Sequence, residues 1–480
     1  MNAYPLFIGA CLAFAGHAAS SPPPAMADPA PAVSPVTVND NAGWCWFQGE
    51  RAQVHAGKLF VGSVASGPAD DARHGNVEVT QVDLATGEIH VAVLAERFQA
   101  DDHNAPALHV RADGRLVALY SKHSSDRLVR WRVSERPADA TAWGPEQTLK
   151  TADGYCYNNV FQLGTPGEPG AALLNFHRGI DRNPNYLVSE DDGLTWRYGG
   201  KLMAWQLDTT DPRATTGDGS FNSRPYVRYA PGMEDGRPDG SVHFITTEDH
   251  PRGYDNSVYH GVVRLIDGVA TVCASDGTPL ARLATTPDAR VQPTDFTRFF
   301  IGSPDAVAWT VDLRVDSAGH PHAVFSTQRG DAGVRGNTHA GGDDLRYHHA
   351  RWDGERWHEQ EIAYAGRALY APEVDYPGLA AIDPDDPATI YISTSADPTT
   401  GTPLVSAADG QRHHELFRGR AGAPGHPWDW TALTRDSDHD NLRPIAAPGD
   451  GSAHALLWLR GNLTTYMDYD LEAVVLPLDR

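Results

Sequence analysis

One unit recurs along most of this chain: a short apolar strand, a turn rich in Gly, Asp and Pro, and a returning strand. Successive units begin roughly 30–85 residues apart, about 60 on average, and such a recurrence of one unit indicates a repeat architecture. No stretch carries the apolar period of a long α-helix. Repeated strand–turn–strand units without helices favour small sheets arranged around an axis.

Seven such pairs of strands are predicted. They are 77–82 with 88–94, 107–110 with 116–120, 157–163 with 171–176, 224–229 with 242–247, 309–315 with 322–327, 379–382 with 389–393, and 443–446 with 455–458. Two further strands, 129–133 and 146–149, extend the second pair. We expect early strands near residues 44–46 to complete the last sheet.

The run Ser189-Glu-Asp-Asp-Gly-Leu-Thr-Trp196 matches the Asp-box pattern S-x-D-x-G-x-T-W at every position. An Asp box is a tight turn between outer strands of a propeller blade, and it serves folding rather than catalysis. The sequence therefore predicts an all-β fold, a single β-propeller of about seven blades spanning residues 39–480. A pair of β-sandwiches and a β-helix are the alternatives.

The N-terminus indicates export. The apolar run 6–15 is too short to span a membrane, and Ala25-Met26-Ala27 resembles a small-residue cleavage site. We expect a signal peptide over 1–27, a Pro/Ala-rich linker over 28–38, and a secreted or periplasmic protein. Cys11 is an alternative lipidation site.

The formal net charge of −23 disfavours nucleic acid and anionic membranes as partners. Three cysteines follow the export signal, an odd number that rules out a complete disulfide framework but leaves one bridge open. The core must therefore hold the fold, and we expect a monomer.

Histidine, tyrosine and arginine gather where the predicted hairpins end. When the chain folds back about Asp113, position i faces position 226 − i, so His103 faces His123. The same construction places Tyr157 opposite Arg178. Applied to every hairpin, it predicts a ring of side chains at one end of the propeller: His103, His123, Tyr157, Arg178, Arg224, Tyr226, His250, Arg443 and Arg460. Asn104, next to His103, is a further candidate for substrate binding.

Such a ring suits β-elimination at a uronic acid. An arginine or protonated histidine would stabilise the charge that develops when the proton on C5 leaves. A histidine or tyrosine would take that proton, and a second such group would protonate the leaving oxygen O4. No metal or redox cofactor is needed for this chemistry.

Each of these residues also has a structural interpretation. His103 could be held by Asp102 at the hairpin end, Arg178 could pair with Asp181, and Tyr155 competes with Tyr157 as the functional tyrosine. The Asp and His spacing carries no metal-ligand signature. The Asp-rich turns offer oxygen ligands for a structural Ca²⁺.

These stretches together resemble the BNR-repeat propeller family that includes ulvan lyases and rhamnose–glucuronate lyases. The resemblance rests on residues 101–106, 157–163, 176–179, 182–184 with the Asp box, 224–229, 247–251, 255–260 and 441–444. It covers most of the mature chain.

The resemblance implies a seven-bladed propeller that cleaves an anionic, uronate-containing polysaccharide by elimination. It places the acid/base histidine at His103, a second histidine at His123, the tyrosine at Tyr157 and the carboxylate-neutralising arginine at Arg178. The chain departs from the family pattern at 157–160 and at His177.

Two other functions remain open. A sialidase-like hydrolase would use Arg178, Arg224 and Arg443 as an arginine triad, although the chain lacks an Arg-Ile-Pro segment before the first blades. A carbohydrate-binding propeller without catalysis would bind the polymer and leave its length unchanged.

Overall fold

The computed structural model describes residues 34–206, 208, 210–214, 224–329, 342–369, 374–422, 427–449 and 454–478. The expected signal peptide and the first part of the expected linker lie outside these residues. The chain divides into the units Met1–Ala32 and Val33–Arg480, and the second unit carries the fold. Its described part holds strands and short 3₁₀ helices but no α-helix. No described helix is long and apolar enough to cross a membrane.

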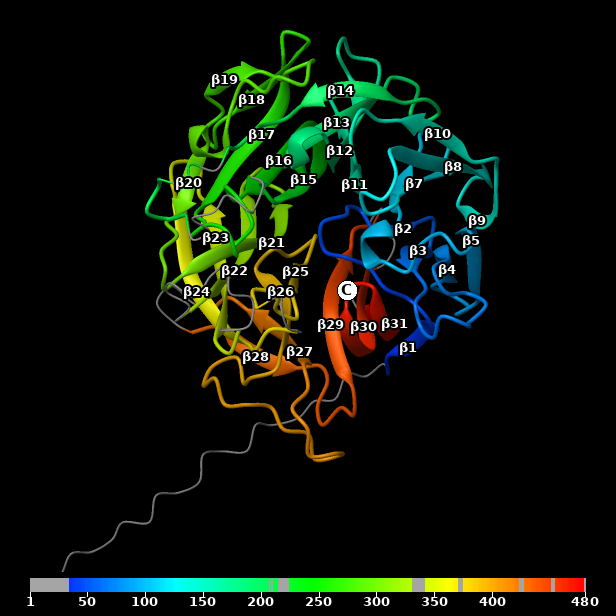
Figure 1. The fold of residues 1–480 in the computed structure, drawn as a ribbon, viewed down its shortest axis with the longest axis vertical. Coiled ribbons are helices and arrows are strands. Elements are labelled where there is room, and N and C mark those ends of the chain that lie inside the picture. Colours follow the sequence, from blue (N-terminus) through cyan, green and yellow to red (C-terminus); the bar gives the residue numbers. More distant parts are fainter. Residues whose placement is uncertain are drawn as a thin grey trace, which may run out of the picture. The chain divides into compact units, whose positions relative to one another are not determined.

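The strands form seven antiparallel sheets, which follow one another in chain order around a common axis (Figure 1). The first blade contains β2 (Ala52–His55), β3 (Lys58–Val64), β4 (Val77–Asp83) and β5 (Ile89–Ala95). The second contains β6 (Ala107–Val110), β7 (Leu116–Ser121), β8 (Leu128–Arg136), β9 (Asp139–Trp143) and β10 (Gln147–Lys150). The third contains β11 (Cys156–Leu163), β12 (Ala172–Arg178), β13 (Pro184–Ser189) and β14 (Arg197–Lys201).

The fourth blade is the largest. It contains β15 (Val227–Glu234), β16 (Arg237–Thr246), β17 (Val258–Ile266), β18 (Val269–Cys273), β19 (Pro279–Arg282) and β20 (Thr297–Phe300). The fifth contains β21 (Val307–Val315), β22 (Pro321–Gln328), β23 (Leu345–Trp352) and β24 (Trp357–Gly366). The sixth contains β25 (Ala380–Ile382), β26 (Thr389–Thr394), β27 (Glu415–Arg420) and β28 (Asp429–Ala432). The seventh contains β29 (Asp440–Ala447), β30 (His454–Thr465), β31 (Asp468–Leu478) and β1 (Val36–Asn39).

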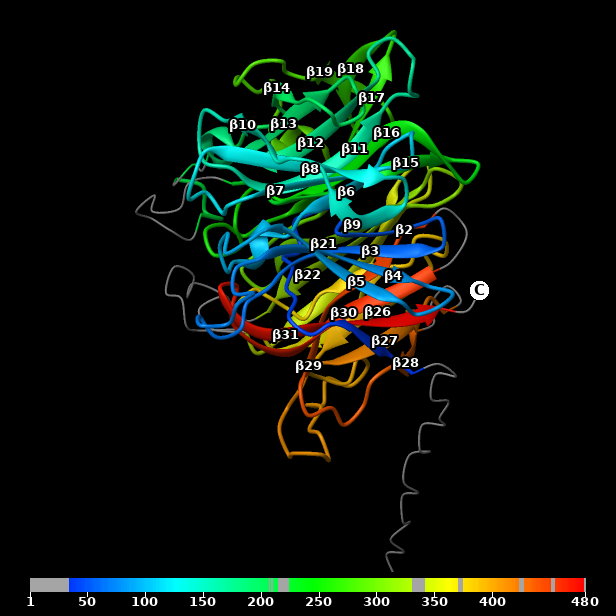
Figure 2. The ribbon, with the colours of Figure 1, turned by 90° about the vertical axis from the view of Figure 1, so that its right-hand side faces the viewer.

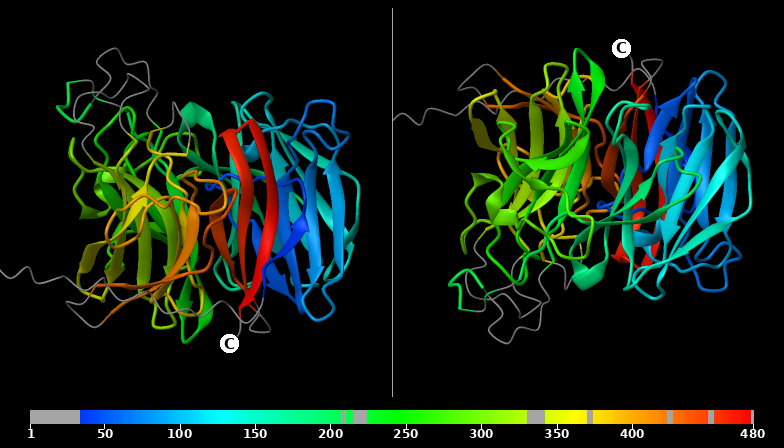
Figure 3. Two further views of the ribbon diagram at one scale, coloured as in Figure 1. Left: turned by 90° about the horizontal axis from the view of Figure 1, so that it is seen from below. Right: turned by 90° about the horizontal axis from the view of Figure 1, so that it is seen from above.

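The N-terminal strand closes the ring. β1 pairs antiparallel with β31, with Val36 opposite Val475, and Figures 2 and 3 show these blue and red strands side by side. The propeller therefore begins before the expected start at Asn39. An early strand completes the last blade as expected, but it is β1 and not residues 44–46, which form no strand. Trp46 is buried and packs against Trp309, with 4.6 Å between ring centroids.

The core lies between the blades and is formed by apolar side chains rather than by cross-links. Cys45, Cys156 and Cys273 are all buried and free, so the single bridge that the sequence left open does not form. Burial of apolar surface along the blade interfaces is the main stabilising contribution to such a fold.

The Asp box lies between β13 and β14, as its pattern predicts. The Asp191 carboxylate accepts hydrogen bonds from the Ser189 hydroxyl at 2.8 Å and from both the amide and the hydroxyl of Thr195, at 2.9 and 2.6 Å. Gly193 has φ +86°, a conformation that favours glycine. Trp196 is buried between the second and third blades.

Replacing Asp191 with alanine should destabilise the protein by about 1–3 kcal/mol, because the turn loses three hydrogen bonds at once. Urea unfolding followed by tryptophan fluorescence measures this loss. The matched control is Glu190→Ala, which removes only an exposed pair with Arg197 and should cost about 0–1 kcal/mol. Equal midpoints for the two variants would contradict the structural role of the Asp box.

Candidate active site

His103 lies in a short 3₁₀ turn, η1 (Asp102–Asn104), between the first and second blades. The turn is capped by Asp101, whose carboxylate accepts a hydrogen bond from the His103 amide at 3.0 Å. β6 then begins, and its register with β7 pairs Ala107 with Leu119. These positions sum to 226, so the predicted fold-back is confirmed.

The two imidazoles meet as the fold-back requires. The rings of His103 and His123 stack with 4.0 Å between centroids and 11° between planes. The Asp101 carboxylate holds both rings, because Oδ1 lies 2.8 Å from His103 Nδ1 and Oδ2 lies 3.0 Å from His123 Nδ1. A bridging carboxylate of this kind fixes the ring orientations and leaves each Nε2 to make other contacts.

His123 positions Arg178, the last residue of β12. Arg178 Nη2 lies 2.9 Å from His123 Nε2, and its Nη1 donates to the Tyr226 hydroxyl at 3.4 Å. No described carboxylate pairs with Arg178. A guanidinium held by neutral groups in a partly buried position is suited to bind an anion from outside.

Tyr157 lies beside this arginine because of a bulge at the start of β11. The register shifts between Cys156 and Asn159, so that Cys156, rather than the expected Tyr157, stands opposite Arg178. Tyr157 has φ +66°, an uncommon backbone conformation for a bulky residue. Its ring still lies 4.9 Å from the Arg178 guanidinium and 5.4 Å from the His103 ring.

The environment sets different charge states for the two histidines. For His103, burial acts to lower the pKa, but the surrounding acidic groups, Asp101 and Asp102 among them, outweigh it and raise the pKa well above its usual range. For His123, burial and the neighbouring His103 charge lower the pKa to about 4, against the opposing effect of Asp101. At neutral pH, His123 is therefore the neutral ring of the pair.

Tyr157 retains its phenolic proton at neutral pH. Burial raises the pKa of Tyr157 well above its usual range, although Arg178 and His103 act in the opposite direction. The competing Tyr155 lies elsewhere: its hydroxyl donates to Asn158 at 2.8 Å and accepts from Asn175 at 2.8 Å, and the ring is fully buried. The structure thus brings Tyr157, and not Tyr155, to the histidine pair.

The fold-back construction did not predict three of the side chains in this cluster. Asp101 bridges the histidines, the ring of Tyr466 lies 5.0 Å from the ring of His103, and Cys45 lies beside the same histidine. Asp101 lies two residues before His103 in the sequence and could have been found there. Tyr466 and Cys45 come from distant segments and carry no local signal.

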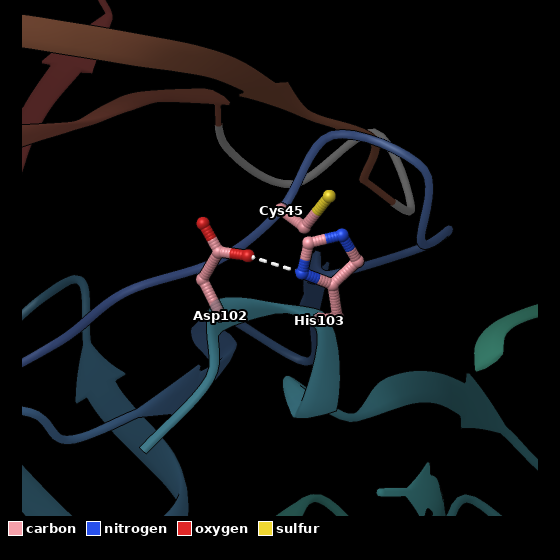
Figure 4. A group of neighbouring side chains, drawn as sticks. All are labelled: Cys45, Asp102 and His103. Atoms are coloured by element: carbon pink, nitrogen blue, oxygen red, sulfur yellow. Dashed lines mark ion pairs between the residues drawn. The ribbon is translucent and has the colours of Figure 1, made fainter. Parts of the chain in front are cut away.

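Two sets of side chains here have donor atoms close enough to hold a metal ion. One is Asp101 with His103 and His123, whose facing atoms already bond to each other. The other is Cys45 with Asp102 and His103, shown in Figure 4. In that view Asp102 approaches one ring nitrogen of His103, at 2.8 Å, and the Cys45 sulfur lies near the other side of the ring.

Three expected substrate-binding residues are not brought to the surface of this cluster. Asn104 is fully buried and its amide holds Gln99. Arg443 is 1% exposed and is bound to Asp102, the carboxylate that also contacts His103. Arg460 pairs with Glu472 on the neighbouring strand β31. Since Arg443 is enclosed, Arg178, Arg224 and Arg443 do not form the arginine triad of a sialidase-like site.

The other three residues expected to bind substrate, Arg224, Tyr226 and His250, lie at the border of the cluster. The Tyr226 ring packs against His250, with 5.4 Å between centroids, and both residues are buried. The backbone amide of Arg224 donates to Asp249 at 3.0 Å, which anchors the entry to β15. The hairpin alignment of this blade with Asp249 and His250 is therefore confirmed.

The seven sheets define a β-propeller. A family model described as "BNR repeat-containing family member" matches residues 60–365, more than half of the chain, so the chain belongs to this family. Comparison with curated proteins gives no match.

Among solved structures, the chain is similar to an ulvan lyase of polysaccharide lyase family 25 bound to GlcA(1–4)Rha3S. The TM-score is 0.63 at 15% identity, over 92% of this chain and 95% of that one. A second structure of such an ulvan lyase gives 0.62 at 14% identity, with the same coverage. An α-L-arabinofuranosidase from Fusarium graminearum gives 0.42 at 11% identity, over 77% and 92%. The likeness to the ulvan lyases shows that the chain shares their fold.

Proposed function

We propose that the protein is a polysaccharide lyase that cleaves a uronate-containing polymer by β-elimination. The observation that carries this proposal is the convergence of three groups: a histidine held by a carboxylate, a phenol, and an arginine that pairs with no described carboxylate. These are the base, the acid and the anion-binding group that the reaction needs.

In the proposed reaction, Arg178 binds the uronate carboxylate, and His123 holds the guanidinium in place. This contact stabilises the negative charge that spreads onto the carboxylate as the C5–H bond breaks. The pKa of Arg178 is raised: burial acts to lower it, but the nearby acidic groups, Tyr157 first among them, act more strongly in the opposite direction. The guanidinium therefore stays charged at every working pH.

His103 and Tyr157 move the protons. His103 Nε2, with Nδ1 held by Asp101, takes the proton from C5, and the electron pair forms the C4=C5 double bond. The C4–O4 bond breaks, and the Tyr157 hydroxyl gives its proton to the leaving oxygen. Proton exchange with solvent then returns both groups to their starting states, so the side chains suffice for the cycle.

A panel of uronate polysaccharides tests the proposal. The purified protein should generate ultraviolet absorbance from the new C4=C5 double bond on at least one polymer. Polymer that is bound but never shortened would indicate a carbohydrate-binding propeller and would contradict the proposal.

The pH dependence of the reaction rate follows from the raised pKa values of His103 and Tyr157. The base must be unprotonated, and His103 holds its proton well above the usual range of histidine. The rate should therefore rise from neutral toward alkaline pH, and should fall again only where Tyr157 loses its proton. Initial rates across buffers from pH 5 to 10 give this profile. A maximum below pH 6 would contradict the assignment of His103 as base.

The variant Asp101→Asn tests whether Asp101 positions and charges His103 or only supports the loop. Removal of the negative charge lowers the pKa of His103, so the rising limb of the profile should move toward lower pH while the maximal rate falls. A variant that loses rate without any shift of the profile would show that Asp101 only supports the loop.

A further inference from the structure

Next to the Arg178 site lies a solvent-open pocket of about 300 Å³ between the second and third blades. Arg178 lines this pocket, whereas His103 and His123 do not. Its lining residues are Ser124, Ser125, Asp126, Arg127, Asp153, Gly154, Arg178, Gly179 and Arg182. The pocket and the proposed carboxylate site thus share a guanidinium.

Arginine charge in this pocket exceeds the available acidic charge. Within the described residues, neither Arg127 nor Arg182 forms a side-chain ion pair or hydrogen bond, and Arg178 pairs with no carboxylate. Of the two acids, Asp126 is neutralised by Arg130 at 2.8 Å, which leaves Asp153. Three guanidiniums therefore face one unpaired carboxylate, in a chain whose net charge is −23.

The loop that carries Arg182 is built to hold one conformation. Asp181 and Arg182 both have φ +58° within η2 (Ile180–Arg182). Buried Asn185 donates to the Ile180 carbonyl at 3.2 Å, and Lys201 binds Asp181 at 2.8 Å. Backbone strain of this kind persists only where the surroundings fix it, and it is common at functional sites.

Neighbouring guanidiniums repel the charge of Arg182, which a bound anion would stabilise. Burial lowers the pKa of Arg182, and the charges of Arg224 and Arg178 lower it further. An arginine so placed gains more from a bound anion than an isolated surface arginine does, because the anion relieves repulsion as well as forming charge-assisted hydrogen bonds.

We propose that this pocket is a second anion subsite, in which Arg182 and Arg127 bind a sulfate ester or a second carboxylate on the polymer strand whose uronate occupies Arg178. The inference rests on the proposed lyase function for the identity of the ligand. Arg182 and Arg127 then determine specificity for polymers that carry a second negative group near the cleaved bond.

The test compares one sulfated uronate polymer with the same polymer after chemical desulfation. Arg182→Gln and Arg127→Gln should each raise KM on the sulfated polymer by about tenfold, the effect of one lost charge-assisted hydrogen bond. The matched control is Arg197→Gln, an exposed arginine of the same blade that pairs with Glu190, which should leave KM at the wild-type value. Thermal midpoints check that all variants fold.

The pattern of KM changes identifies the anion. An increase confined to the sulfated polymer supports a sulfate subsite, and equal increases on both polymers support a carboxylate subsite. Unchanged KM values on both polymers would overturn the inference while leaving the lyase proposal intact.

Calorimetric titration with a sulfated uronate oligosaccharide separates this inference from the proposed function, because it needs no turnover. If the wild type binds and Arg182→Gln binds about tenfold more weakly, the subsite stands even for a protein that cleaves nothing. Equal affinity of the two proteins would overturn it.

Discussion

Replacing His103 with alanine should lower the rate of unsaturated-product formation by about 10²–10⁴-fold, the usual effect of removing a general base. The reason is its geometry: His103 is the ring held by both Asp101 and Asp102, and it stacks on His123 within reach of Tyr157. Initial rates at saturating polymer measure the loss. The unfolding temperature checks that the fold survives.

His109→Ala is the matched control for this variant. His109 lies on β6 of the same hairpin and bonds to Asp192 of the Asp box at 3.1 Å, away from the cluster. Its loss should leave the rate within about twofold of the wild type, as for a surface substitution. If His103→Ala retained a tenth of wild-type activity or more, His103 would not be the base.

Replacing Tyr157 with phenylalanine should cost about as much, 10²–10⁴-fold in rate, because the hydroxyl is the proposed proton donor to O4. The ring and its contact with Arg178 are retained, so the stability should stay near that of the wild type. Arg178→Ala, in comparison, removes the charge partner of the carboxylate and should cost about 10²–10³-fold.

Tyr155→Phe is the control for Tyr157→Phe, because it should lower stability and not activity. It removes a buried hydroxyl that bonds to both Asn158 and Asn175, so the protein should lose about 1–3 kcal/mol of stability while keeping most of its activity. The pair of variants thus separates a chemical tyrosine from a structural one two residues away. Full activity of Tyr157→Phe on every cleaved polymer would exclude Tyr157 as the acid.

Local sequence was sufficient to predict the pairing of His103 with His123. The turn at Asp113-Gly114 fixes the register of the hairpin, and the two-residue period of strands then places both rings on one face. The blade count and the Asp box were predictable for the same reason, since repeats and tight turns are encoded locally. The family resemblance pointed to the same residues.

Errors arose where the structure departs from regular pairing. The bulge in β11 shifts the partner of Arg178 by one residue, and a bulge leaves no clear mark in a single sequence. β30 continues to Thr465, beyond its expected end at Trp458, so Arg460 lies within the strand instead of at its end. Arg443 falls in another irregular stretch, between Leu442 and Ile445, and is enclosed with Asp102.

Contacts made by closure of the ring could not be predicted at all. Tyr466 lies in the turn between β30 and β31 of the last blade, yet its ring lies within 6 Å of both histidine rings, at 5.0 and 5.7 Å between centroids. Cys45 reaches His103 from the segment between β1 and β2. Such neighbours depend on the curvature and closure of the whole propeller rather than on any one hairpin.

Cleavage of a uronate polymer in water enriched in oxygen-18 tests the central proposal most directly. Elimination adds no water, so we expect unsaturated products, each lighter by one water than the corresponding hydrolysis product. Bond cleavage should incorporate no heavy oxygen into them. Mass spectrometry must be done before the reducing end exchanges its oxygen with the solvent. Saturated products that carry one heavy oxygen at the new end would show hydrolysis and would contradict the assignment of a lyase.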